Sequence, residues 1–243
     1  MTRVLVTGSA QGLGHAAATR LLDDGHEVIV HLRARSRADA VGDLIQRGAT
    51  LMLGDLGDLE QIHELADQVR AAGNVDAIIH NAGVLDGDNL LHVNVVAPYL
   101  LTALLAPPDR AVFLSSDMHT GGRTAIDDID WSGRRSPRSY SDSKLYVTAL
   151  SAAVARLCPS VLSNAVDPGW VPTRMGGRSA PDDLELGHVT QVWLATSSDA
   201  DALTSGDYWY HQTRQTPHPA VHDLAFQDQL LVSLAEYTDA TLS

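Results

Sequence analysis

Arg3-Val-Leu-Val-Thr7, followed directly by Gly8-Ser-Ala-Gln-Gly12-Leu-Gly14, is the stretch that decides how the chain is expected to fold. The apolar residues predict a short buried strand, the glycines predict a tight turn, and the residues to about position 24 predict a helix. In a strand, glycine turn and helix of this kind, backbone N–H groups and the helix N-terminus can approach a diphosphate. The stretch therefore indicates a nucleotide site, with a tight turn that binds nothing as the alternative.

Strands and helices are predicted to alternate along the rest of the chain. Further strands are expected at residues 27–32, 50–53, 75–80, 111–115 and 161–166, with a short seventh at 207–210. Helices are expected at 37–47, 59–71, 90–105, 139–157 and 224–237. The alternation predicts an α/β fold over residues 1–243, one domain with helices on both faces of a doubly wound, mostly parallel sheet of six to seven strands. Right-handed crossovers give the strand order 3-2-1-4-5-6, and ligands then bind at the carboxyl ends of the strands.

The composition narrows the class of partner. Seventeen Lys and Arg against 30 Asp and Glu give a net charge of −13, which argues against nucleic acid or an anionic membrane. No apolar run approaches the roughly 20 residues of a membrane span, and the start of the chain lacks a signal sequence. The single Cys158 excludes an internal disulfide. A cytoplasmic protein is expected.

The glycine turn has the spacing T-G-x-x-x-G-x-G, and at this point the sequence resembles the short-chain dehydrogenase/reductase family. The resemblance implies a Rossmann fold, an NAD(P) cofactor, oxidoreductase activity and a homodimer or homotetramer. Asp55, Leu56 and the Asn81–Gly83 segment would border the adenine, while Val171 and Thr173 would face the nicotinamide carboxamide. The cofactor-binding positions implied in this way are Thr7, Gly8, Gln11, Gly12, Leu13, Gly14, Asp55, Leu56, Asn81, Ala82, Gly83, Tyr140, Lys144, Pro168, Gly169, Val171 and Thr173.

Tyr140 and Lys144 lie four residues apart at the start of a predicted helix, so their side chains share one face. The ammonium is expected to lower the tyrosine pKa, which would make the phenol a usable general acid/base. By the same resemblance, Ser116 orients the substrate and Asn94 holds a water in a proton relay. The expected reaction is hydride transfer between the cofactor and a carbonyl or secondary alcohol of a small organic substrate. A non-catalytic NADP-binding sensor or scaffold and a reductase of activated C=C bonds stay open as alternatives.

The segment between Ser116 and Tyr140 narrows the resemblance to one branch of the family. It contains Met118-His-Thr-Gly121 and Ile126-Asp-Asp-Ile-Asp-Trp131, and it is longer than in compact members of the family. This pattern is similar to the retinol-dehydrogenase-like and WW-domain-oxidoreductase-like branch. His119 and the acidic residues Asp127, Asp128 and Asp130 lack the fixed oxygen spacing of divalent-ion loops, so no metal is expected.

The end of the second strand, His31-Leu-Arg33-Ala-Arg35-Ser-Arg37, bears on cofactor choice. Leu32 stands where NAD enzymes place an acid for the ribose 2′-hydroxyl, and the planar fork of Arg33 suits a 2′-phosphate. NADP(H) is therefore predicted as the preferred cofactor, with NAD(H) as the lesser one, and a solvated arginine run is the alternative. Two further segments are expected on the substrate side, a lid at about 170–188 and the C-terminal segment 212–243.

Overall fold

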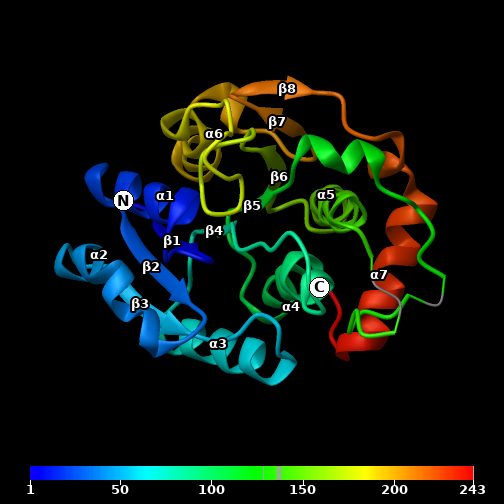
Figure 1. Ribbon diagram of the computed structural model, residues 1–243, viewed down its shortest axis with the longest axis horizontal. Helices are drawn as coiled ribbons and strands as arrows, with labels where there is room; N and C mark the ends of the chain where they lie inside the picture. Colours follow the sequence, from blue (N-terminus) through cyan, green and yellow to red (C-terminus); the bar gives the residue numbers. More distant parts are fainter. Residues whose placement is uncertain (128, 136–137, 243) are drawn as a thin grey trace.

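The structure is a computed structural model of the chain, and it describes residues 1–127, 129–135 and 138–242. One sheet of eight strands runs through these residues in the order β3-β2-β1-β4-β5-β6-β7-β8 (Figure 1). Neighbouring strands pair in parallel from β3 to β7, and β8 pairs antiparallel with β7. The strands are β1 (Arg3–Val6), β2 (Glu27–Leu32), β3 (Thr50–Leu53), β4 (Ala77–His80), β5 (Arg110–Leu114), β6 (Leu162–Asp167), β7 (Tyr208–Tyr210) and β8 (Thr213–Gln215).

The predicted α/β fold and the doubly wound, mostly parallel sheet are confirmed, but the strand count is eight instead of six or seven. The additional strand, β8, has three exposed residues and lies within the predicted substrate-side segment. A strand this short and polar has no apolar alternation, because its pairing with β7 rather than burial holds it in place.

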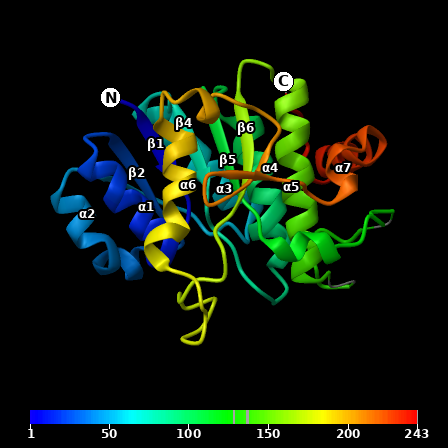
Figure 2. The ribbon, with the colours of Figure 1, turned by 90° about the horizontal axis from the view of Figure 1, so that it is seen from above.

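Helices cover both faces of the sheet (Figures 1 and 2). On one side α1 packs against α6, with α2 nearby, and on the other side lie α3, α4 and α5. The last helix, α7, packs on the outside of α5. The helices are α1 (Gly12–Asp23), α2 (Gly42–Gln46), α3 (Leu59–Ala72), α4 (Ala97–Leu104), α5 (Tyr140–Leu157), α6 (Leu184–Thr196) and α7 (Leu224–Thr238).

Alternate residues of each central strand face opposite helical layers. In β1, Val4 and Val6 belong to the apolar cluster under α1, whereas Leu5 belongs to the cluster under α3 and α4. Both faces of a parallel sheet are covered, which explains why these strands are almost wholly apolar. A third cluster joins α5 to α7 through Phe226, Leu230 and Leu234, so the last helix packs inward.

Two predicted segments differ in detail. Residues 35–41 form a 3₁₀ helix before the short α2, so only the end of the predicted helix at 37–47 is α-helical. The helix predicted at 90–105 begins with a π-helical turn at His92–Val96 and continues as α4. Both stretches are helical in sequence pattern, but tertiary contacts set their local hydrogen bonding.

Helix α6 was not predicted, and it takes the last residues of the segment expected to be a lid. Its buried positions include polar residues, His188, Thr190 and Gln191, beside Val192 and Leu194. Because these buried positions mix polar and apolar residues, the helix has no clear apolar stripe for sequence analysis to detect. The irregular part of the lid is therefore residues 170–183, and this segment projects beyond the sheet in Figure 2. Within the described residues, no helix combines the length and the apolar character needed to cross a membrane.

Candidate active site

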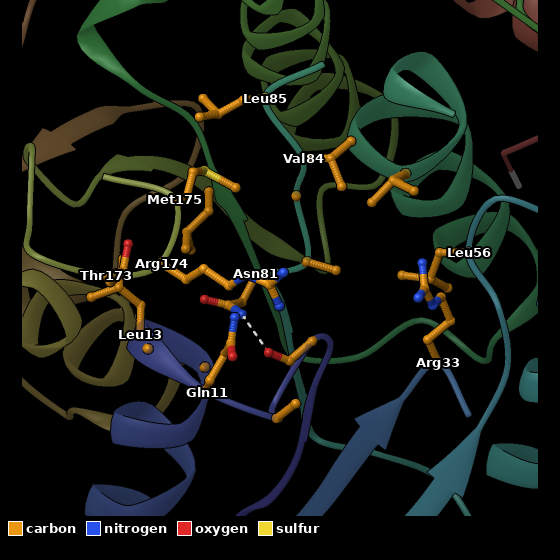
Figure 3. A pocket seen from close by; sticks show the side chains of 18 of the residues that line it. Gln11, Leu13, Arg33, Leu56, Asn81, Val84, Leu85, Thr173, Arg174 and Met175 are labelled. Atoms are coloured by element: carbon orange, nitrogen blue, oxygen red, sulfur yellow. Dashed lines mark hydrogen bonds between the residues drawn. The ribbon is translucent and has the colours of Figure 1, made fainter. Parts of the chain in front are cut away.

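A cavity of about 620 Å³ opens at the carboxyl ends of the central strands (Figure 3). Most of the predicted cofactor positions line it: Gly8, Gln11, Gly12, Leu13, Gly14, Arg33, Asp55, Leu56, Asn81, Ala82, Gly83, Tyr140, Lys144, Pro168 and Thr173. Thr7, Gly169 and Val171 lie behind this surface, and Asn94 and Ser116 do not line it either. The polar motifs from the ends of separate strands thus meet in one place.

The glycine turn packs directly against the end of β4. Gly8 has a φ of +70°, and a Cβ on Gly14 would lie 2.4 Å from the Asn81 Nδ2 atom. Asn81 Nδ2 donates to the Thr7 carbonyl at 2.8 Å, and the Thr7 hydroxyl accepts from the Ala82 N–H at 3.0 Å. Asn81 and Thr7 therefore hold the turn in shape, and only glycine fits at the two positions.

The N-terminus of α1 is chemically unlike those of the other long helices. No side chain caps it and its first turn holds no acidic residue, whereas α3, α5, α6 and α7 begin at side-chain caps from Asp58, Ser139, Asp183 and Asp223. Its N–H groups point toward the cavity side of the glycine turn with the positive end of the helix dipole. These features suit the diphosphate of a dinucleotide cofactor.

Two arginines that follow β2 line the cavity. The Arg33 side chain is 67% exposed and its Nε lies 3.9 Å from Asp55 Oδ2, so most of its donors are free for a ligand. Arg37 also lines the cavity, and its Nη2 donates to Gln11 Oε1 at 3.4 Å. The sequence prediction selected Arg33 alone, although the run of alternating arginines was the signal for both. Leu32, at the end of β2, is buried beside them.

Tyr140 is the first residue of α5, and a capping box fixes that end of the helix. The Ser139 hydroxyl accepts from the Asp142 N–H at 3.1 Å, and the Asp142 carboxylate accepts from the Ser139 N–H at 3.0 Å. The same buried carboxylate pairs with Arg123, whose Nη2 lies 2.7 Å from Asp142 Oδ2. Burial raises the pKa of Asp142, but the bonds from Arg123 and the backbone outweigh it and hold the pKa at about 2. The Ser-x-x-Asp pattern was the missed signal for this anchor.

Lys144 is almost fully buried beneath the ring of Tyr140. Its Nζ lies 5.4 Å from the ring centroid and donates to the Leu114 carbonyl at 2.7 Å. Burial raises the pKa of Tyr140 to about 12, against the hydrogen bond with Ser116, and burial lowers the pKa of Lys144 to about 8, against the attraction of Asp167. The predicted lowering of the Tyr140 pKa is therefore wrong for this structure, because the cost of burying a phenolate exceeds the effect of the Ser116 hydrogen bond.

One buried histidine connects the Ser116 turn with the C-terminal segment. His119 Nδ1 lies 2.8 Å from the Ser116 carbonyl, and His119 Nε2 accepts from the His218 N–H at 3.0 Å. This pattern assigns the ring proton to Nδ1. The ring of Tyr208 packs against it with centroids 4.5 Å apart, and burial lowers the His119 pKa. His119 thus acts as a bridge, a role the sequence prediction missed because its partner lies far away in the sequence.

Asn94 lies in the π-helical turn before α4, and its side chain is occupied by protein partners. Its Oδ1 accepts from the Val84 N–H, and its Nδ2 donates to the Val84 carbonyl and to the Ser143 hydroxyl, each at 2.9 Å. The amide joins the strand end after β4 to α5 next to Lys144. Its predicted part in a water relay stays a prediction.

In the acidic cluster after Ile126, Asp127 accepts from Gln229 Nε2 on α7, whereas the bonds of Asp130 are local. Asp130 Oδ1 accepts from the Ser132 hydroxyl at 2.6 Å and Asp130 Oδ2 from the Arg135 N–H at 2.7 Å, while Asp128 lies outside the described residues. In the described part of the chain, no three His, Cys, Asp or Glu side chains are placed to hold a metal.

The lid is held by its own polar contacts. Asp182 Oδ2 accepts from the Trp170 N–H at 2.6 Å, and Trp170 Nε1 donates to the Gly176 carbonyl at 2.8 Å. Val171 is buried beneath the segment. Thr173, Arg174 and Met175 then face the cavity (Figure 3), of which the sequence prediction had selected Thr173 only.

The chain is similar to known proteins over its whole length. The model of the short chain dehydrogenase family matches residues 2–118. The short-chain dehydrogenase chry4 of Gibberella zeae is 35% identical over 100% of this chain and 99% of its own, and human retinol dehydrogenase 13 is 31% identical over 84% and 70%. A crystal structure of an uncharacterized protein from Mycobacterium paratuberculosis has the same fold, with a TM-score of 0.85, 23% identity and coverage of 100% and 95%.

These matches agree with the glycine turn, the doubly wound sheet and the uncapped helix N-terminus at the cavity. The identity to full-length relatives is high enough to show the family rather than the fold alone. The chain belongs to the short-chain dehydrogenase/reductase family, as an NAD(P)-dependent oxidoreductase similar to its retinol-dehydrogenase-like branch.

Proposed function

We propose that the protein transfers hydride between NADP(H) and a carbonyl or secondary alcohol of a small organic substrate, with Tyr140 as the general acid/base. The observation that carries the proposal is the meeting of Tyr140 and Lys144 at the wall of the cavity that contains the glycine turn, with Ser116 hydrogen-bonded to Tyr140 beside it. Three groups from two elements distant in sequence converge where a reacting oxygen could bind.

Each side chain has a role that follows from its surroundings. When bound, the nicotinamide cofactor supplies or accepts the hydride. Tyr140 keeps its proton at neutral pH, because burial raises its pKa to about 12, and it holds that proton at Oη for a developing alkoxide. Ser116 hydrogen-bonds the substrate oxygen, and the charge of Lys144 stabilises the phenolate that remains after proton transfer.

The choice of NADP(H) rests on charge at the end of β2. An uncharged Leu32 replaces the acid that would repel a 2′-phosphate, and Arg33 and Arg37 offer guanidinium donors beside it. Neither guanidinium forms a short ion pair in the described part of the chain. Arg33 Nε lies 3.9 Å from Asp55 Oδ2, and the side chain of Arg37 donates to the neutral amide of Gln11.

The first test is the variant Tyr140→Phe, assayed with a panel of ketones, aldehydes and secondary alcohols. Loss of the positioned proton donor is expected to lower kcat by about 10²–10⁴-fold while cofactor affinity stays unchanged. Tyr237→Phe is the matched control, because Tyr237 belongs to α7, is hydrogen-bonded to His92 and does not line the cavity. Activity near wild type in Tyr140→Phe would contradict the proposal, and a product reduced at C=C would redirect it.

The second test is the variant Arg33→Ala, with kcat/KM measured for both cofactors. Removal of the guanidinium is expected to lower kcat/KM with NADP(H) by about tenfold and to leave NAD(H) almost unaffected, because only NADP(H) carries the 2′-phosphate. A wild-type enzyme that uses NAD(H) equally well or better would refute the preference.

A further inference from the structure

The lid crosses the cavity from the glycine turn to the end of β4. A Cβ on Gly12, the first residue of α1, would lie 3.2 Å from Thr173 Cγ2, and a Cβ on Gly83 would lie 3.9 Å from Met175 Cε. These two contacts bracket Arg174, which must sit between them. Figure 3 shows its side chain directed from the lid into the cavity, on the side of Gln11 and Asn81.

Arg174 has no acidic partner in the described part of the chain. The ion pairs found there involve other arginines, such as Arg33 with Asp55 and Arg123 with Asp142. The acidic residues among those that line the cavity are Asp55, which lies beside Arg33, and Asp86, which pairs with no arginine. Arg174 thus contributes an uncompensated positive charge to the cavity wall in a protein of net charge −13.

The part of the cavity next to Arg174 already suits an anion. The N-terminus of α1 has no side-chain cap and no acidic residue in its first turn, so its N–H groups and helix dipole face the cavity unopposed. An arginine held over such a terminus by its neighbour Thr173 adds a planar fork that matches phosphate oxygens.

We propose that Arg174 binds the diphosphate of the cofactor and in this way holds the lid, residues 170–183, over the cavity. The inference depends on the NAD(P) cofactor of the family and not on which bond the enzyme reduces. It separates two cationic contacts, Arg33 at the adenosine end and Arg174 at the diphosphate.

The diphosphate is common to NADP(H) and NAD(H), and this allows a clear test. Dissociation constants of NADPH and NADH are measured by fluorescence or calorimetry for the wild type and for Arg174→Ala, Arg174→Lys and Arg178→Ala. We expect Arg174→Ala to weaken both cofactors by the same factor, on the order of tenfold, because one charge-assisted contact is lost. Arg174→Lys should recover part of the affinity, since the charge remains without the fork.

Arg178→Ala is the matched control. Arg178 is an exposed arginine of the same lid, four residues further on, and it does not line the cavity. Its removal changes the net charge equally and should leave both dissociation constants unchanged. Equal losses in Arg178→Ala and Arg174→Ala would overturn the proposal in favour of a general charge effect.

Two fragments of the cofactor sharpen the assignment. ADP-ribose contains the diphosphate, and its affinity should fall about tenfold in Arg174→Ala, whereas adenosine 2′-monophosphate lacks the diphosphate and should bind as in the wild type. Unchanged affinity for NADPH and NADH, a loss confined to NADPH, or a raised substrate KM with unchanged cofactor affinity would each refute the proposal. Melting temperatures of the unliganded variants verify that they are folded, and the binding readout holds even if the proposed reaction is wrong.

Discussion

The two halves of the chain build their parts of the site by different means. In the first half, to about residue 118, the cofactor positions sit in short turns at the ends of parallel strands, and this is the half that the family model matches. In the second half, long segments are fixed by polar contacts between residues 12 to 99 positions apart in sequence. Arg123 with Asp142, His119 with His218, and Trp170 with Asp182 are such contacts.

The difference indicates which substitutions each half of the chain can tolerate. Glycine positions in the first half are dictated by close approach, because a Cβ added at Gly8 or Gly14 would clash with Ala82 or Asn81, which directly follow β4. In the second half, one side chain can be removed without a backbone clash. Damage to the glycine turn should therefore abolish cofactor binding, whereas loss of the His119–His218 contact should lower turnover and leave binding intact.

The strongest test of this comparison is the variant Gly14→Ala. Its Cβ would lie 2.4 Å from Asn81 Nδ2 and 2.6 Å from the Gly8 carbonyl, so the turn must shift. We expect cofactor affinity to fall by about 100-fold or more, as read by titration with NADPH, since the loss includes several backbone contacts. Gly42→Ala is the control, because Gly42 has helical φ and no atom within 4 Å of an added Cβ, and it should bind the cofactor normally.

A weaker effect is expected in the second half for His119→Phe. The phenyl ring keeps the packing on Tyr208 but loses the bonds to Ser116 and His218. We expect kcat to fall by about tenfold, in line with the loss of two hydrogen bonds, while the cofactor dissociation constant stays constant. His222→Phe, at an exposed position on the same segment, should have no effect on kcat. A matching loss of cofactor affinity would show that the two halves are not separable.

The environment of His119 also predicts in which direction the stability of the protein changes with pH. Burial lowers the His119 pKa in the folded protein, so the unfolded state binds more protons and stability rises with pH around the histidine range. The stabilisation is present above the ordinary pKa near 6.5 and is lost as pH falls toward the lower folded value. The free energy of unfolding, measured with denaturant at pH 5 and at pH 7, should differ less between the two pH values for His119→Phe than for the wild type.

The smallest expected effect concerns the pKa of Lys144, which is the only lysine of the chain and lies where the two halves meet. A ¹³C-lysine label gives a single side-chain NMR signal, and its titration should fall near pH 8 in place of 10.5, because burial disfavours the charge. Asp167 raises this pKa, so Asp167→Asn should lower the midpoint further. A midpoint near 10.5 would mean that Lys144 is solvated. Carbonyl reduction should weaken above about pH 8, where Lys144 loses its charge.

Local sequence patterns were enough to predict the order of strands β1 to β6, the glycine turn and the Tyr140–Lys144 pair. These features depend on periodicity and on backbone geometry within a few residues, so they can be recognised without knowledge of distant contacts. It also placed most of the residues that line the cavity, because the carboxyl ends of parallel strands meet at one edge.

The remaining features arise from contacts that form only in the folded protein. Helix α6 has no apolar stripe because polar and apolar residues share its buried positions, and β8 exists through its pairing with β7. The raised Tyr140 pKa, the bridging role of His119 and the position of Arg174 depend on burial and on partners that the fold brings together across many residues. Desolvation and long-range contacts have no signature in local sequence, which is why the chemistry of the site could be located from the sequence but its electrostatics could not.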